Sequence, residues 1–253
     1  MHMLMDMTRE EIRSIAPDAT VVLPVGAVEQ HGYHLPVSTD VLLVERIAVL
    51  SAELAGLEIP LVLAPTQPFG FSHHHFLYPG AMSLPTDLLQ KVLVELVESL
   101  IRSGFHRIFI LNGHGGNEEC VRIAARMAAL QHPVLAGAGS YWTMAWDDMR
   151  EYGLQQGLYG MPGHAGAFET SMMLAVRPDL VHMDRVPVRQ GHEAGPPGKG
   201  LLERPRIEHH ASWSRIDGYS DEPLKGETRH GTALLKIISK AVASEFITFH
   251  HKL

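Results

Sequence analysis

Short apolar runs recur along the chain, and longer segments with apolar residues at helical spacing separate them. The runs predict buried strands at Thr20–Val25, Leu61–Ala64, Arg107–Leu111 and Val134–Ala138. The spacing predicts helices over Val41–Leu57, Thr86–Ser103, Asn117–Leu130 and Thr232–Phe249. Strands that alternate with long helices are typical of βαβ units, in which helices cover both faces of a mainly parallel sheet. We therefore expect an α/β fold.

The length of the chain and its longest loop favour one domain. A single domain commonly has about 100–200 residues, so the 253 residues here allow one large domain or two small ones. The stretch Gln190–Pro205 contains four glycines and three prolines, which predicts a long loop. One domain over residues 1–253, elaborated by this loop, fits the pattern better than two domains.

Composition narrows the class of protein. A hydrophobic content of 45% predicts a sizeable core, and a net charge of −7 argues against a nucleic-acid partner. Apolar runs such as Ala19–Ala27 are far shorter than the roughly 20 residues that span a membrane. The single cysteine, Cys120, and the lack of a leader-like apolar segment in Met1–Glu11 predict a cytoplasmic protein.

Histidine is unusually frequent, with 17 residues, and several histidines lie in polar segments marked by glycine. Two such segments follow predicted strands, Val25–Asp40 and Asn112–Asn117, and a third, His164–Ser171, opens another helical pattern. Ligands of open parallel sheets bind beyond the carboxyl ends of the strands. These three segments are therefore candidates for one shared site.

The first segment combines residue types that bind metal ions. Glu29 and His31 are two residues apart in a loop after a strand, and Asp40 lies where the next helix begins. This arrangement can direct two carboxylates and an imidazole to one point. The spacing is not a general metal motif, and Asp40 also suits a helix N-cap. The segment therefore indicates either a metal site or a polar loop that ends in a cap.

The other two segments add one histidine and one glutamate. Gly115 and Gly116, directly after His114, let the backbone pass close to a ligand or present N–H groups to an oxyanion, although an ordinary tight turn has the same pattern. Glu169 follows His164 by five residues at a helix start, where acidic residues are common without any function.

Together the three segments supply ligands for two divalent metal ions. Zn²⁺ accepts imidazole and carboxylate ligands, and Mn²⁺ or Fe²⁺ tolerate the same mixture. Asp40, with two carboxylate oxygens, is the natural bridge between two metals. The candidate ligands are Glu29, His31, Asp40, His114 and Glu169.

These residues also carry a family resemblance. The motifs Glu29-Gln-His31-Gly-x-His-Leu-Pro-x-x-x-Asp40, Asn112-Gly-His114-Gly-Gly-Asn117 and His164-Ala-Gly-x-x-Glu169-Thr-Ser171 together resemble the creatininase (creatinine amidohydrolase) family, over roughly Pro24 to Gly231. The resemblance implies one three-layer α/β/α domain, a dinuclear metal site and hexamers. It also implies hydrolysis of a small cyclic or linear amide by metal-activated water.

The resemblance assigns roles to single residues. The five candidate ligands match the metal ligands of the family, so His114 belongs to the catalytic centre, and His164 matches the histidine that is proposed to shuttle a proton. Substrate contacts are expected from Ser72, His75, Gly115, Gly116 and Trp142.

One departure bears on the substrate. True creatininase has a bulky residue and a glutamate where this chain has Gly115 and Gly116, so creatinine is not the expected substrate and Glu169 must supply the missing carboxylate. The family also includes a formamide deformylase, a peptidase that trims a modified peptide and a hydrolase of a cyclic keto-inositol. A non-catalytic metal-binding protein is a further alternative, which the complete ligand set and His164 disfavour.

Overall fold

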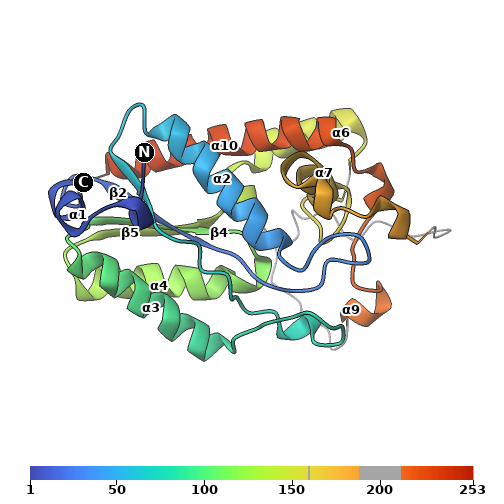
Figure 1. Ribbon diagram of the computed structural model, residues 1–253, viewed down its shortest axis with the longest axis horizontal. Helices are drawn as coiled ribbons and strands as arrows, with labels where there is room; N and C mark the ends of the chain where they lie inside the picture. Colours follow the sequence, from blue (N-terminus) through green and yellow to red (C-terminus); the bar gives the residue numbers. More distant parts are fainter. Residues whose placement is uncertain (159, 188–211, 253) are drawn as a thin grey trace.

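A parallel sheet of five strands lies at the centre of the computed structural model, which describes residues 1–158, 160–187 and 212–252 (Figure 1). The strand order is β1-β3-β2-β4-β5. The strands are β1 (His2–Met3), β2 (Thr20–Val25), β3 (Leu61–Leu63), β4 (Arg107–Asn112) and β5 (Leu135–Ser140). All four predicted strands are confirmed, and β1 is additional because two residues are too few to form a pattern.

Helices cover both faces of this sheet. α2 (Thr39–Ala55) and α10 (Thr228–His250) lie on one face, whereas α3 (Thr86–Arg102) and α4 (Glu118–Gln131) lie on the other (Figure 1). The predicted α/β fold with three layers is therefore confirmed.

Strand side chains alternate between two hydrophobic cores, one on each face of the sheet. Val22 and Phe109 belong to the core that includes α2 and α10, whereas Val21 and Ile108 belong to the core that includes α3 and α4. Every residue of β2 is buried. Burial on both faces explains why the strands appear in the sequence as continuous apolar runs rather than as alternating patterns.

Shorter helices complete the described fold. They are α1 (Arg9–Ile15), α5 (Tyr141–Met144), α6 (Trp146–Gln156), α7 (Ala167–Val176) and α9 (Ser212–Arg215). The helical pattern expected at His164–Ser171 corresponds to α7. The predicted loop Gln190–Pro205 lies outside the described residues. Among the described helices, none combines the length and the hydrophobicity needed to cross a bilayer.

The arrangement of β2 and β4 determines where the polar segments meet. The two strands are neighbours at the middle of the sheet, and their last residues, Val25 and Asn112, are paired in register. The Gly113 N–H then donates a hydrogen bond to the Val25 carbonyl at 2.8 Å. The segments after both strands therefore begin side by side at the carboxyl edge.

Candidate metal centre

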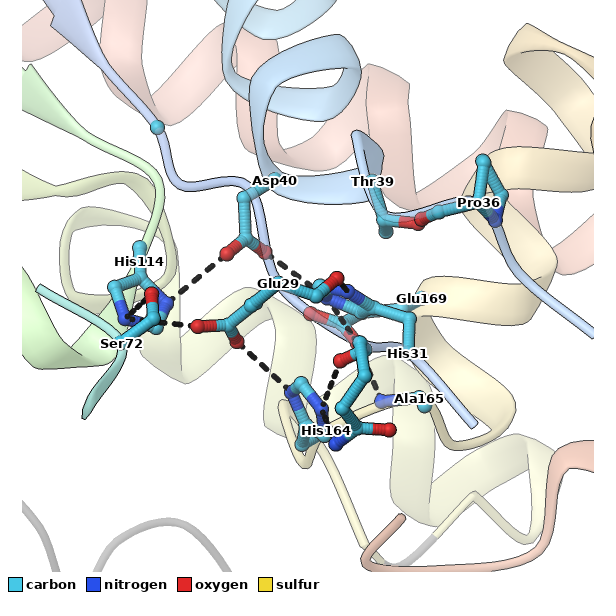
Figure 2. Close-up of polar contacts among 12 residues, drawn as sticks. Glu29, His31, Pro36, Thr39, Asp40, Ser72, His114, His164, Ala165 and Glu169 are labelled. Atoms are coloured by element: carbon cyan, nitrogen blue, oxygen red, sulfur yellow. Dashed lines mark hydrogen bonds and ion pairs between the residues drawn. The ribbon is translucent and has the colours of Figure 1, made fainter. Parts of the chain in front are cut away.

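Asp40 lies at the centre of a cluster of buried polar side chains (Figure 2). Its Oδ1 is 3.2 Å from His31 Nε2, and its Oδ2 is 3.0 Å from His114 Nδ1. The N-cap position of α2 is held by Ser38, so Asp40 belongs to the first turn of the helix. The carboxylate therefore lies between two imidazoles, with one oxygen directed to each.

Glu29 and His114 form the part of the cluster that follows β2 and β4. Glu29 Oε2 is 3.3 Å from His114 Nε2, and Glu29 Oε1 is 3.2 Å from His75 Nε2. Burial alone would raise the pKa of Glu29, but the imidazoles of His114 and His75 outweigh burial and hold that pKa well below its usual value. The Glu29 carboxylate is therefore ionised although it is fully buried.

Glu169, in the first turn of α7, lies on the opposite side of Asp40. Its Oε2 is 3.7 Å from His31 Nε2 and accepts a hydrogen bond of 2.5 Å from the Ala165 N–H. The helix start thus orients the carboxylate toward the imidazole that also faces Asp40.

His164 packs against the cluster without being directed at Asp40. Its Nδ1 is 3.5 Å from Glu29 Oε1, and its ring centroid lies 4.4 Å from that of His31 and 4.5 Å from that of His75. Burial and the neighbouring His31 lower the pKa of His164 well below its usual value. The ring is therefore neutral near pH 7 and can accept a proton.

The charges of the cluster determine which of its side chains are protonated when no metal is bound. Burial alone would lower the pKa of His31, but Asp40 and Glu169 outweigh burial and raise it to about 10. Burial is outweighed in the same way at His114, whose pKa rises to about 9 beside Glu29. Burial raises the pKa of Glu169 to about 8. Without metal, protons on the imidazoles therefore supply the positive charge that the carboxylates require.

The donor set fits divalent metal ions. Among the described residues, the buried oxygens Glu29 Oε1, Glu29 Oε2 and Asp40 Oδ2 receive no hydrogen bond of good geometry and face imidazoles alone, so a cation can pair with them. In the part of the chain that the structure describes, three sets of potential ligands each have their three ligand atoms within 4.8 Å of one another: Glu29 with His74 and His114, Glu29 with His31 and His164, and His31 with Asp40 and Glu169. Mixed imidazole and carboxylate ligands suit Zn²⁺ and Mn²⁺.

The two glycines after His114 have different surroundings. A Cβ at Gly116 would lie 2.2 Å from the Phe71 carbonyl oxygen and 2.5 Å from His114 Nε2, so no side chain fits there. A Cβ at Gly115 would meet no atom of the described residues within 4 Å. A carboxylate at position 116 is therefore excluded by packing, and the acidic groups of the cluster are Glu29, Asp40 and, on the opposite side of Asp40, Glu169.

The structure brings most of the sequence-predicted site residues together. The five candidate ligands, His164, His75 and Gly116 make the contacts described above, and the Ser72 hydroxyl is 3.5 Å from His114 Nε2. Trp142 is buried in the hydrophobic core with its ring 4.9 Å from that of Tyr141. The aromatic ring that packs on His75 and His164 is instead that of Trp213, at 4.5 and 4.9 Å.

Sequence reasoning missed three contributors. His74 is not among the residues predicted from the sequence, yet it belongs to one of the sets of potential ligands. Trp213 lies about 140 residues from His75 in sequence, so no local pattern connects them. Gln30 lies between the candidate ligands Glu29 and His31 in the first motif. This position is the one sequence signal that could have identified Gln30 as part of the site.

Comparison with known proteins places the chain in a family. The family model for creatinine amidohydrolase matches residues 5–246. The creatinine amidohydrolase of Pseudomonas putida is 34% identical over 192 residues, which cover 70% of this chain and 71% of that protein. The mycofactocin precursor peptide peptidase of Mycolicibacterium smegmatis is 33% identical, with 71% of this chain and 66% of that protein covered. The 3-dehydro-scyllo-inosose hydrolase of Thermotoga maritima is 30% identical, with 70% and 57% covered.

Solved structures agree with the sequence comparison. A crystal structure of creatinine amidohydrolase superposes with a TM-score of 0.79 at 27% identity, with 99% of this chain and 98% of that chain covered. Similar creatininase structures include a manganese form, with a TM-score of 0.77 at 27% identity, and a zinc–zinc form of a mutant, with 0.75 at 25%; both cover 96% of each chain. The chain therefore belongs to the creatinine amidohydrolase family of hydrolases, which confirms the resemblance in the motifs.

Proposed function

We propose that this chain is a metal-dependent amidohydrolase with two divalent cations, Zn²⁺ or Mn²⁺, with Fe²⁺ as a further candidate. Glu29, Asp40 and His114 would hold one cation, and His31, Asp40 and Glu169 would hold the other. The observation that carries this proposal is the position of Asp40, whose two carboxylate oxygens face His31 and His114 separately. A carboxylate that serves only one metal, or only caps a helix, does not require an imidazole at each oxygen.

The chemistry follows from the donor set and from His164. Bound divalent cations lower the pKa of water and polarise a carbonyl oxygen. The chain's carboxylates fix the positive charge in a buried site, where it acts most strongly. His164, neutral and beside Glu29, takes a proton from the attacking water and returns it to the leaving nitrogen. The open space at Gly115 allows the substrate to approach the backbone.

We propose a small cyclic or linear amide as the substrate class. The family supports hydrolysis at a carbonyl, and the packing at Gly116 leaves no place for the glutamate expected of true creatininase. The similarity to a peptide peptidase and to an inosose hydrolase makes a modified peptide or a cyclic keto-sugar the second candidate.

A substrate screen tests the proposal. The full chain, loaded with Mn²⁺ or with Zn²⁺, is assayed against small lactams, formamides, short peptides and cyclic ketones, and turnover of an amide is expected. His164→Ala is the diagnostic variant, because positioned proton transfer is worth about 10²–10⁴-fold in rate while the metals do not depend on it. If His164→Ala has the rate of the parent, His164 does not transfer the proton. If the fully loaded parent hydrolyses none of these compounds, the chain is a metal-binding protein rather than an enzyme.

We also propose how the protein is organised. Residues 1–253 act as one catalytic domain, in the cytoplasm, as a homo-oligomer of six subunits. The support is the single cysteine and the family match across nearly the whole chain. Light scattering at micromolar concentration should give a mass several times the 27.9 kDa of one chain. A particle of one chain would contradict the oligomer.

A further inference from the structure

The side chain of Gln30 lies buried among residues of the proposed centre. Its Oε1 accepts a hydrogen bond of 2.8 Å from the Gly32 N–H, which determines which end of the amide is oxygen and which is nitrogen. Its Nε2 lies 2.8 Å from the Gly218 carbonyl oxygen, 2.9 Å from His75 Nδ1 and 3.1 Å from His164 Nε2. One amide nitrogen with two protons therefore faces three atoms that are able to accept a proton.

The number of donors decides how these contacts are made. The Gly218 carbonyl oxygen can only accept, so it takes the first amide proton. His164 Nε2 is also 2.9 Å from the main-chain carbonyl oxygen of Gln30, which again can only accept. His164 must therefore carry a proton on Nε2 to make that contact, and it leaves the second amide proton for His75 Nδ1.

The opposite assignment makes fewer hydrogen bonds. If His164 Nε2 accepted the second amide proton, its lone pair would face the lone pairs of the Gln30 main-chain oxygen at 2.9 Å. His75 Nδ1 would then lose its donor at 2.9 Å in exchange for the longer contact of 3.1 Å. Buried polar atoms are rarely left unpaired in this way, so the first assignment holds.

We propose that Gln30 is a positioning residue that fixes the tautomers of two histidines in the centre. Its side chain keeps the proton of His75 on Nε2, the nitrogen 3.2 Å from Glu29 Oε1. Its main-chain carbonyl keeps the proton of His164 on Nε2, so that His164 Nδ1, 3.5 Å from the same oxygen, has a free lone pair.

These tautomers matter for the reaction, and this step rests on the proposed function. With Nε2 protonated, His164 presents Nδ1 toward Glu29 as the only ring nitrogen able to accept a proton from water. His75, protonated at Nε2, presents its N–H to the Glu29 carboxylate at 3.2 Å and supports its negative charge. Residues that orient ligands in this way are typically worth about 10–100-fold in metal affinity or activity.

Nitrogen NMR spectroscopy tests the assignment without a substrate. In the full chain loaded with Zn²⁺ and labelled with ¹⁵N-histidine, protonated and unprotonated ring nitrogens give separate lines, which His75→Ala and His164→Ala assign. We expect both parent rings to carry their proton on Nε2. Gln30→Glu keeps the shape of the side chain but replaces the donor beside His75 by an acceptor. In that variant His75 should gain a proton on Nδ1, while His164 keeps its proton on Nε2.

Thr170→Val is the matched control, because Thr170 is equally buried and contacts another imidazole, His34 Nε2, at 2.8 Å. It should leave the His75 and His164 lines unchanged. If Gln30→Glu does not fold, Gln30→Met still removes the donor, and the His75 Nδ1 line should move to that of a nitrogen without a hydrogen bond. A parent with its His75 proton on Nδ1, or a His75 pattern unchanged in the folded variants, overturns the proposal.

The rate provides a second readout once a substrate is identified. Gln30→Glu should lower kcat by about 10–100-fold, with KM and metal content near those of the parent. Equal losses in kcat and in metal content would indicate a merely structural role and would overturn the positioning role. Because the NMR test needs no turnover, an inactive parent would defeat the proposed function and leave the tautomer assignment open to its own test.

Discussion

The two halves of the proposed centre are built from different kinds of structure. In the strand half, Glu29 and His114 follow β2 and β4, which are paired over their whole length in the middle of the sheet. In the α7 half, Glu169 lies at the start of α7 and faces His31 from there. Asp40 contacts both halves.

Different interactions hold these halves in place. In the strand half, the Asn117 side chain donates a hydrogen bond of 3.0 Å to the Gly26 carbonyl, next to the contacts of the sheet itself. The loop before α7 is held instead by a distant segment. The His164 N–H donates to the Ser220 hydroxyl at 2.6 Å, and the Ser220 N–H donates to the His164 carbonyl at 2.9 Å.

The difference teaches which half is easier to perturb. Sheet pairing forms cooperatively with the hydrophobic core, so the strand half persists as long as the fold persists. The start of α7 depends in addition on contacts between segments more than fifty residues apart, and we predict that it opens locally at a lower free-energy cost than the strand half. Substitutions that affect one half, or the carboxylate shared by both, therefore measure how independent the two halves are.

Asp40→Asn should produce the largest effect, because Asp40 belongs to both halves. The substitution keeps the shape of the side chain but removes the charge that compensates the repulsion between two dications. Metal content after dialysis, measured by elemental analysis, should fall from about two per chain to below one. Circular dichroism controls for folding. A folded Asp40→Asn that still holds two metals would show that Asp40 does not bridge them.

Replacing one terminal carboxylate should separate the halves. Glu29→Gln is expected to remove the metal of the strand half, and Glu169→Gln that of the α7 half, so each variant should retain about one metal per chain. The double variant should retain none if the halves are independent. Loss of both metals in either single variant would mean that the two sites form only together.

Metal binding should release protons, because cations replace the protons of the cluster. At pH 7 the pKa values of about 10 for His31, about 9 for His114 and about 8 for Glu169 keep all three groups protonated without metal. Binding therefore displaces these protons, and affinity rises with pH between about 7 and 10. Calorimetry in buffers with different ionisation enthalpies measures the release. His164→Ala should release as many protons as the parent, whereas proton-neutral binding would place the metals elsewhere.

The sequence predicted the strand half more fully than the α7 half. Apolar runs located β2 and β4, and the candidate ligands Glu29 and His114 follow these strands directly. Their contact then follows from parallel pairing, which brings the carboxyl ends of neighbouring strands to one edge. The structure bears out that proximity, while their role as ligands stays a prediction.

The parts that escaped prediction depend on tertiary contacts or weak patterns. α6 lacks an apolar stripe long enough to mark it, and contains Gly153. Trp213 packs on the site histidines from a segment with no motif. Asp221 lies outside the three motifs, and its contacts with a distant loop have no local signature.

Asp221 anchors the loop of the α7 half. Replacing this buried acid should change the pH dependence of stability, which is the smallest of the effects predicted here. The carboxylate accepts a hydrogen bond from the Ala167 N–H, and its Oδ1 has no hydrogen-bond partner within the described part of the chain. A Cβ at Gly166 would lie 1.1 Å from Oδ1, and one at Gly160 would lie 2.5 Å from Oδ2. The glycines therefore make room for a buried acid beside the start of α7.

The pH dependence of the free energy of unfolding should reveal the raised pKa of Asp221. Burial raises the pKa of Asp221 to about 7 from its usual 3.8, so between about pH 4 and 7 the folded chain keeps a proton that the unfolded chain has lost. The free energy of unfolding therefore decreases as pH rises through this window, by an amount on the order of a few kcal/mol. Asp221→Asn cannot ionise, yet it retains an acceptor for the Ala167 N–H. The free energy of unfolding of Asp221→Asn, minus that of the parent, should therefore be larger at pH 8 than at pH 5.

Urea unfolding at several pH values measures this difference between Asp221→Asn and the parent. The exposed Asp87, in the first turn of α3, provides the matched control, because water solvates its carboxylate in both the folded and the unfolded chain. Asp87→Asn should therefore give a curve nearly parallel to that of the parent. Asp221→Asn should also retain about two metals, since the start of α7 stays capped. A parallel curve for Asp221→Asn would mean that its carboxylate is solvated, and a lost metal would mean that the α7 half needs the charge itself.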